Sequence, residues 1–109
     1  MYKWVSPAAF GLTAPILVAL LTGSAALAAE GASDKRAAEL FASTCGFCHE
    51  NGGRVAGKGP KLAGTTRSDA FIVNRIKEGK EGAMPAFDGA LSNSQIKGIV
   101  HYIRNLKSK

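Results

Sequence analysis

The most specific signal in the chain is residues 45–49, which read Cys45-Gly46-Phe47-Cys48-His49. It contains both cysteines of the chain and one of its two histidines. Two cysteines separated by two residues are compatible with a structural disulfide, a thioredoxin-type redox pair or part of a zinc site. When a histidine follows directly, the same pattern indicates covalent attachment of haem.

Haem attachment explains both the spacing and the histidine. Each thiol adds across one vinyl group of the porphyrin, and the two vinyls lie on adjacent pyrroles. The sulfurs must therefore be a short, fixed distance apart, and His49 then lies under the iron as its proximal ligand. We predict one covalently attached haem c, held by Cys45 and Cys48.

The other interpretations need features that the chain lacks. A redox pair would require a preceding strand, whereas residues 33–43 contain no β-branched run and predict a helix. A zinc site would need two more suitably spaced ligands, and only His101 remains, with no further cysteine.

The iron needs a second axial ligand, and haem electron carriers often use methionine or a second histidine for it. Beyond the first 28 residues only Met84 and His101 qualify. Pro85 restrains Met84 to an extended conformation in a glycine-flanked loop, whereas His101 lies opposite the apolar stripe of a predicted helix. We predict His49 and Met84 as the iron ligands. A six-coordinate iron disfavours oxygen binding and peroxidase chemistry.

The first thirty residues differ in composition from the rest. No charged residue occurs from position 4 to 29, the apolar centre spans residues 16–21, and Ala26-Leu27-Ala28 resembles a cleavage site. This layout predicts a secretory signal peptide over residues 1–28 and a single mature domain over residues 29–109. The uncharged run is also long enough to cross a bilayer, so an uncleaved anchor is the alternative. Either way we expect export to the periplasm, with membrane attachment only if the leader is retained.

The remaining pattern predicts three helices joined by loops. Ser33 can cap a helix over residues 33–43, and Ser68 one over residues 68–78 that Gly79 ends. Ser92 and Gln95 form a capping-box pattern at the start of a helix over residues 92–106. Residues 46–64 are glycine-rich and predict a loop. Because no segment alternates with period two, we expect no sheet and an all-α fold.

In this order the elements resemble those of a small bacterial class I c-type cytochrome with one haem. The resemblance covers residues 34–106. It implies the cytochrome c fold, in which three to five helices wrap around one covalently attached haem and the terminal helices cross. It rests on a helix ending in Phe41, the Cys45–His49 motif, Gly59-Pro60-Lys61-Leu62, a middle helix, Met84-Pro85-Ala86-Phe87, and a last helix with Tyr102.

The resemblance also implies roles for individual residues. The Pro60 carbonyl would accept the second N–H of His49, a role that spacing alone cannot separate from that of a plain turn proline. Leu62 and Phe87 would pack on the haem.

It further implies that Gly98 and Tyr102 form part of a helix crossing with Phe41. Mitochondrial members place a tryptophan and tyrosines near the haem propionates, but residues 29–109 contain no tryptophan and one tyrosine. The propionate partners stay open, with Arg67, Thr65 and Thr66 as candidates.

The chain has 14 basic against 8 acidic residues, a net charge of +6, which falls to +5 without Lys3. Lys58 and Lys61 lie near the attachment motif, and Lys77 and Lys80 precede Met84. They suggest a basic ring that steers acidic redox partners, although a scattered solvated surface is the equal alternative. Dispersed charge without an aromatic platform argues against nucleic-acid binding.

The function predicted from the sequence is that of a monomeric periplasmic electron carrier and not of an enzyme. It would move one electron between a dehydrogenase or reductase and an oxidase. One alternative is a thiol–disulfide oxidoreductase that uses Cys45 and Cys48. Another is a dedicated electron-acceptor subunit of a quinoprotein dehydrogenase, because Met84-Pro85-Ala86-Phe87 is similar to the form found in cytochromes that serve such enzymes.

Overall fold

The computed structural model describes residue 11 and residues 23–107 of the chain, and within them the fold is helical. Its four helices are α1 (Gly23–Thr44), α2 (Glu50–Gly53), α3 (Asp69–Glu78) and α4 (Asn93–Arg104). These described residues form no strand, only two isolated bridges, Lys80 with Met84 and Asp88 with Leu91. The expected all-α fold is confirmed.

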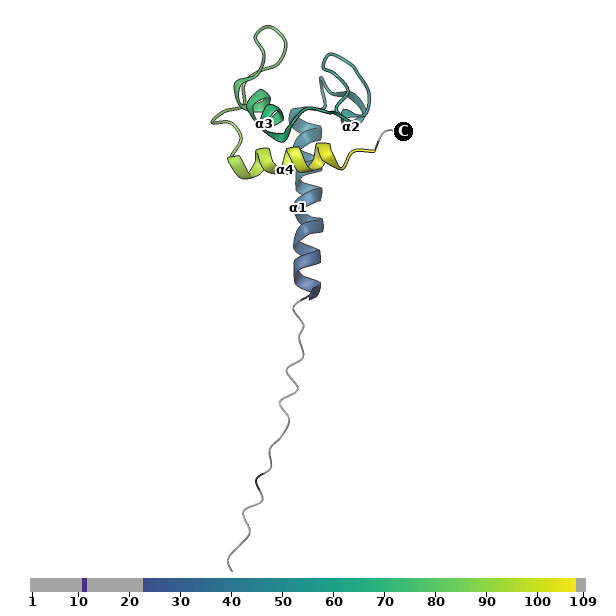
Figure 1. Cartoon of the computed structure of the whole chain (residues 1–109), viewed down its shortest axis with the longest axis vertical. Coiled ribbons are helices and arrows are strands. Elements are labelled where there is room, and N and C mark those ends of the chain that lie inside the picture. Colours follow the sequence, from purple (N-terminus) through teal and green to yellow (C-terminus); the bar gives the residue numbers. More distant parts are fainter. Residues whose placement is uncertain (1–10, 12–22, 108–109) are drawn as a thin grey trace, which may run out of the picture.

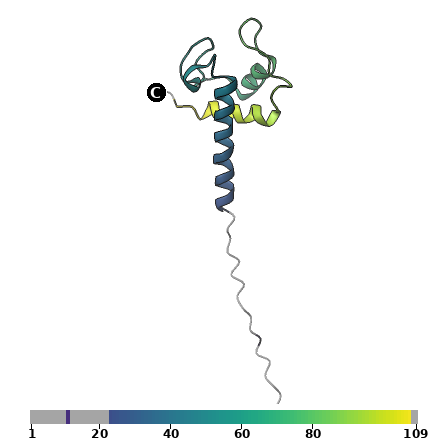
Figure 2. The same cartoon turned by 180° about the vertical axis from the view of Figure 1, so that it is seen from behind.

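The last helix lies across the first. In Figure 1, α4 crosses the C-terminal half of α1, and the loops that follow α1 and α3 stand beyond this crossing. The view from behind shows the same arrangement, with both loops at one end of the molecule (Figure 2). The loop that contains the predicted haem motif and the loop that contains Met84 therefore lie at the same end of the fold.

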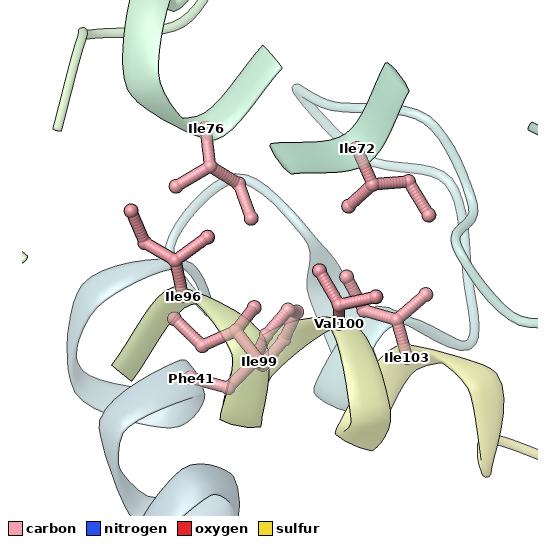
Figure 3. Packing of buried hydrophobic residues seen from close by; sticks show 7 residues of the cluster. All are labelled: Phe41, Ile72, Ile76, Ile96, Ile99, Val100 and Ile103. Atoms are coloured by element: carbon pink, nitrogen blue, oxygen red, sulfur yellow. The ribbon is translucent and has the colours of Figure 1, made fainter. Parts of the chain in front are cut away.

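The core is small and built mainly from isoleucine. Its central cluster takes side chains from three helices, and they point toward one another in Figure 3. Its members are Phe41 of α1, Ile72 and Ile76 of α3, and Ile96, Ile99, Val100 and Ile103 of α4. The α4 residues recur at helical spacing, which is why this helix buries one face completely.

The expected helix crossing is confirmed. A methyl group built on Gly98 of α4 would lie 3.5 Å from Cβ of Ala37 on α1. One turn further along each helix, the rings of Phe41 and Tyr102 lie with their centroids 4.8 Å apart. A small residue on each helix thus brings the two backbones close, and an aromatic pair completes the contact.

The two later helices begin at the predicted residues. Ser68 accepts a hydrogen bond from the Phe71 N–H at 3.1 Å, and α3 ends at Gly79, whose φ is 67°. Ser92 and Gln95 form the reciprocal capping box that starts α4. Helix α4 ends at Arg104, two residues before the predicted end.

The predicted start of the first helix is wrong. Helix α1 begins at Gly23 and not near Ser33. The stretch between them is rich in alanine, the best helix former, and contains no proline. The capping potential of Ser33 does not interrupt such a segment.

The structure describes only part of the predicted leader, residue 11 and residues 23–28. Its apolar centre, residues 16–21, lies outside the described residues. The expected cleavage site at residue 28 falls within the backbone of α1, and both the signal peptide and the anchor remain predictions. Among the helices that the structure describes, none combines the length and apolarity needed to cross a bilayer.

Candidate haem-attachment site

The attachment motif follows directly from the end of α1. The Cys45 N–H donates to the Phe41 carbonyl at 2.7 Å, and the His49 N–H donates to the Cys45 carbonyl at 2.9 Å. The Cys48 N–H reaches the same Cys45 carbonyl at 3.2 Å. Two hydrogen bonds to one carbonyl thus hold Cys45, Cys48 and His49 in a single tight turn.

Both cysteines are free thiols and half-buried. Burial, reinforced by the neighbouring Cys48, raises the pKa of the Cys45 thiol from 9.0 to about 11. Redox-active cysteines need a lowered pKa, because the thiolate is the nucleophile. The environment of Cys45 is the opposite of that of a thiol–disulfide catalyst.

The His49 ring is buried and oriented. Its Nδ1 lies 2.9 Å from the Pro60 carbonyl oxygen, so the protonated Nδ1 donates to that oxygen. Its exposed fraction is 8%, and its ring centroid lies 6.3 Å from that of Phe41. With Nδ1 used in this way, Nε2 is the nitrogen available to a metal. The expected contact between His49 and Pro60 is present, although Pro60 is itself exposed.

Gly59 lets this carbonyl approach. Its N–H donates to the Cys48 carbonyl at 2.8 Å. A Cβ added at Gly59 would lie only 2.6 Å from Cε1 of His49. Only glycine lets the backbone pass so close to the ring. No sequence pattern predicts this contact between Gly59 and His49; the one available signal is the place of Gly59 beside Pro60 in a glycine-rich loop.

A second contact that the sequence did not reveal holds the backbone after His49. Asn51, Gly52 and Gly53 all have positive φ, from 49° to 88°, which makes α2 a turn within the predicted loop. The Tyr102 hydroxyl donates to the Gly52 carbonyl at 2.9 Å. The Leu62 N–H donates to the Gly53 carbonyl at 2.9 Å. Helix α4 thereby supports the segment that orients His49.

Met84 reaches the core from the other loop. Its backbone exchanges two hydrogen bonds of 2.8 Å with Lys80, which close a short turn. The Phe87 N–H donates to the Ile76 carbonyl at 3.0 Å and ties this loop to α3. Met84 is half-buried and packs against the central cluster.

The structure brings most of the predicted site residues to one core. Four of them are partly buried against the same cluster: Cys45, Leu62, Met84 and Phe87. His49 and Met84 come from separate loops, residues 45–64 and 79–91, which stand at one end of the molecule (Figures 1 and 2).

The candidate propionate partners and the alternative iron ligand contact other residues of the chain. The Arg67 guanidinium lies 4.6 Å from the Phe71 ring centroid, and the Thr65 hydroxyl accepts from the Arg67 N–H at 3.2 Å. His101 is exposed, as expected, and its Nε2 lies 3.4 Å from a carboxylate oxygen of Asp34.

This donor set suits haem c. Two free thiols stand on one turn with a histidine whose Nε2 is available, and the thioether side chain of Met84, the predicted second ligand, packs against the same apolar core. The features define a small helical protein that attaches one haem.

Comparison with known proteins leads to the same class of protein. The chain matches the family described as cytochrome C oxidase, cbb3-type, subunit III, over residues 32–103. It is 31% identical to a cytochrome c6 of Synechocystis, with 100% of this chain and 96% of the relative covered. It is 35% identical to a cytochrome c6 of Thermosynechococcus vestitus, with 86% and 88% covered. It is 34% identical to a cytochrome c6 of Euglena gracilis, with 61% and 84% covered.

The chain belongs to the cytochrome c family, as a small c-type cytochrome with a single haem. It is an electron carrier, and its cofactor is haem c. The comparisons give no support to a thiol–disulfide oxidoreductase or to a quinoprotein dehydrogenase subunit.

Proposed function

We propose that the chain is an exported one-electron carrier in which His49 and Met84 are the axial ligands of the iron. Cys45 and Cys48 hold the haem covalently. The observation that carries this proposal is the 2.9 Å contact between Nδ1 of His49 and the Pro60 carbonyl, directly after two free thiols. A hydrogen bond of this kind fixes the tautomer and the orientation of a metal-binding imidazole.

The other residues have complementary tasks. When bound, the haem supplies reversible one-electron exchange. Cys45 and Cys48 would hold it covalently at the end of α1, while Met84, held by its turn with Lys80, would offer the second iron ligand. Leu62 and Phe87, which pack on the same core, would exclude water from the cofactor. With His49 and Met84 both holding the iron, no position would remain for a substrate, so we propose a carrier without enzymatic activity.

We propose that the leader is removed on export to the periplasm. Support comes from the uncharged run over residues 4–29 and the alanines before the expected cut. Intact-mass measurement of the native holoprotein tests this directly. A mass that includes residues 1–28 would instead establish the anchored form.

The partners we propose are redox proteins with acidic docking surfaces, a dehydrogenase or reductase as donor and an oxidase as acceptor. The chain itself would act as a monomer. Support comes from the net charge of +5 that remains without Lys3 and from exposed Lys58, Lys61 and Lys80. The rate of electron transfer to such a partner should fall as ionic strength rises. A rate that is flat from low to high salt would remove this part of the proposal.

Spectroelectrochemical titration of the purified holoprotein tests the proposal as a whole. It reports the haem type, the weak charge-transfer band of methionine bound to ferric iron, and the one-electron midpoint together. Protein that loses all haem on extraction with acidic acetone would contradict covalent attachment. Rapid binding of carbon monoxide to the native ferrous form would contradict ligation by Met84.

A further inference from the structure

Phe47 is the most exposed of the large apolar side chains that the structure describes. Its exposed fraction is 78%, against 46% for Val55 and 37% for Phe71. Isolated surface hydrophobics are common, but Phe47 lies between Cys45 and Cys48, the two residues assigned to the haem. Its exposure therefore falls within the segment that would hold the haem.

Lys58 covers one face of this ring. Its Nζ lies 3.6 Å from the Phe47 ring centroid. The backbone around Lys58 is folded back onto the attachment motif, because the Gly59 N–H donates to the Cys48 carbonyl at 2.8 Å. An ammonium group is strongly hydrated, so its position marks the solvent side of the ring. A cation–π contact at an exposed site is weak enough to be exchanged for a stronger ion pair.

The surrounding loop is predominantly basic. Residues 45–64 contain three basic side chains, Arg54, Lys58 and Lys61, against the single acidic side chain of Glu50. Lys58 and Lys61 are exposed and Arg54 is half-buried. An exposed aromatic ring that contacts a lysine, in a loop with an excess of basic residues, is complementary to an apolar recess edged with carboxylates.

We propose that Phe47 is the apolar anchor at which an acidic redox partner protein docks. The Phe47 ring enters an apolar recess of the partner, and Lys58 leaves the ring to pair with a carboxylate at its edge. Docking here places the partner against the covalent attachment of the haem. This inference rests on the proposed function of electron transfer and adds the residue that anchors the partner.

The chain offers a matched control in Phe71. This ring is also exposed and also lies beside cations, with Arg67 and Arg75 at 4.6 and 5.3 Å from its centroid. It belongs to α3, outside the attachment motif. Truncation of Phe71 removes the same side-chain atoms without touching the proposed anchor.

The test uses holoproteins with Phe47→Ala, Phe71→Ala or Lys58→Gln, and flavodoxin as an acidic probe protein. Calorimetric titration gives the Kd at low ionic strength, and stopped-flow gives the second-order rate of ferric haem reduction by reduced flavodoxin. We expect Phe47→Ala to raise the Kd about tenfold or more, and Phe71→Ala to change it less than twofold. Lys58→Gln should weaken binding and flatten its salt dependence.

The outcomes separate this inference from the proposed function. Equal effects of Phe47→Ala and Phe71→Ala would overturn the docking assignment, and so would a wild-type protein that fails to bind flavodoxin at low ionic strength. If Phe47→Ala has the wild-type spectrum, midpoint potential and Kd, Phe47 is not the anchor, while the proposed carrier function stands. A wild-type protein without reversible one-electron chemistry refutes the carrier itself.

Discussion

At the scale of single residues, the orientation of one imidazole depends on the absence of one methyl group. Gly59 allows the chain to pass the His49 ring, and Pro60 then places its carbonyl 2.9 Å from Nδ1. The strength of that hydrogen bond affects the basicity of the ring and hence the stability of ferric iron.

Replacement of Gly59 should therefore disturb the iron. In Gly59→Ala the new Cβ would lie 2.6 Å from the His49 ring, so the ring must shift and its bond to Pro60 must weaken. We expect a changed midpoint potential and a changed ferric spectrum. Gly57→Ala is the control, because its Cβ would meet only the flexible, exposed side chain of Glu50. Identical midpoints for the two variants would contradict the role given to Gly59.

Replacement of Met84 should open the iron. Met84→Ala removes the proposed sixth ligand, so the methionine charge-transfer band should disappear and ferrous protein should bind carbon monoxide. The potential should fall, because methionine favours ferrous iron. His101→Ala is the control and should retain the wild-type spectrum, since His101 is exposed and faces Asp34. A wild-type spectrum that lacks the band, and that changes in His101→Ala but not in Met84→Ala, would identify the other histidine as the ligand.

At the scale of elements, the crossing of α1 and α4 allows more space than a glycine requires. A methyl group at Gly98 would lie 3.5 Å from Cβ of Ala37, an ordinary van der Waals distance. In the interior of a helix, glycine costs about 1 kcal/mol relative to alanine.

Gly98→Ala should therefore leave stability unchanged or raise it by up to about 1 kcal/mol. Gly98→Leu should lower it by about 1–3 kcal/mol, because the larger side chain would push the helices apart. Thermal unfolding of the two holoproteins, followed by far-UV circular dichroism, measures both effects. A destabilised Gly98→Ala would mean that the two helices pack more tightly than this distance indicates.

Local signals defined some helix ends and not others. Ser68 and Ser92 predicted the starts of α3 and α4, because their hydroxyls bond backbone N–H groups three residues along. Ser33 carried a similar signal, yet α1 begins ten residues earlier. A capping residue starts a helix only where the preceding residues do not themselves continue it, and the alanines before Ser33 do.

At the scale of the whole molecule, the core is too small to be secure without a cofactor. Its central cluster has seven buried members, of which Phe41, Ile96 and Ile99 are fully buried. Domains of this size commonly depend on a metal, disulfide or cofactor. A covalently held haem would join that cluster through Leu62, Met84 and Phe87, which pack against it.

Loss of attachment should then unfold the protein. We expect a Cys45→Ala/Cys48→Ala double variant, made without haem, to lose most of its far-UV helical signal at room temperature. Met84→Ala is the control. It should keep the haem attached through both thioethers and lose only one iron ligand, so it should retain the helical signal. A fully helical double variant would show that the polypeptide core suffices.

The sequence by itself determined the cofactor chemistry, because the spacing of Cys45, Cys48 and His49 is local and specific. It also determined the all-α class and the apolar face of α4, which follow from periodicity. The tertiary structure was needed to show that the missing side chain of Gly59 makes room for the His49 ring. It was also needed to show that the Tyr102 hydroxyl donates a hydrogen bond to the Gly52 carbonyl, fifty residues away. Only the tertiary structure showed Lys58 over the Phe47 ring. Such contacts depend on the folded path of the glycine-rich loop, which no short-range pattern of residues specifies.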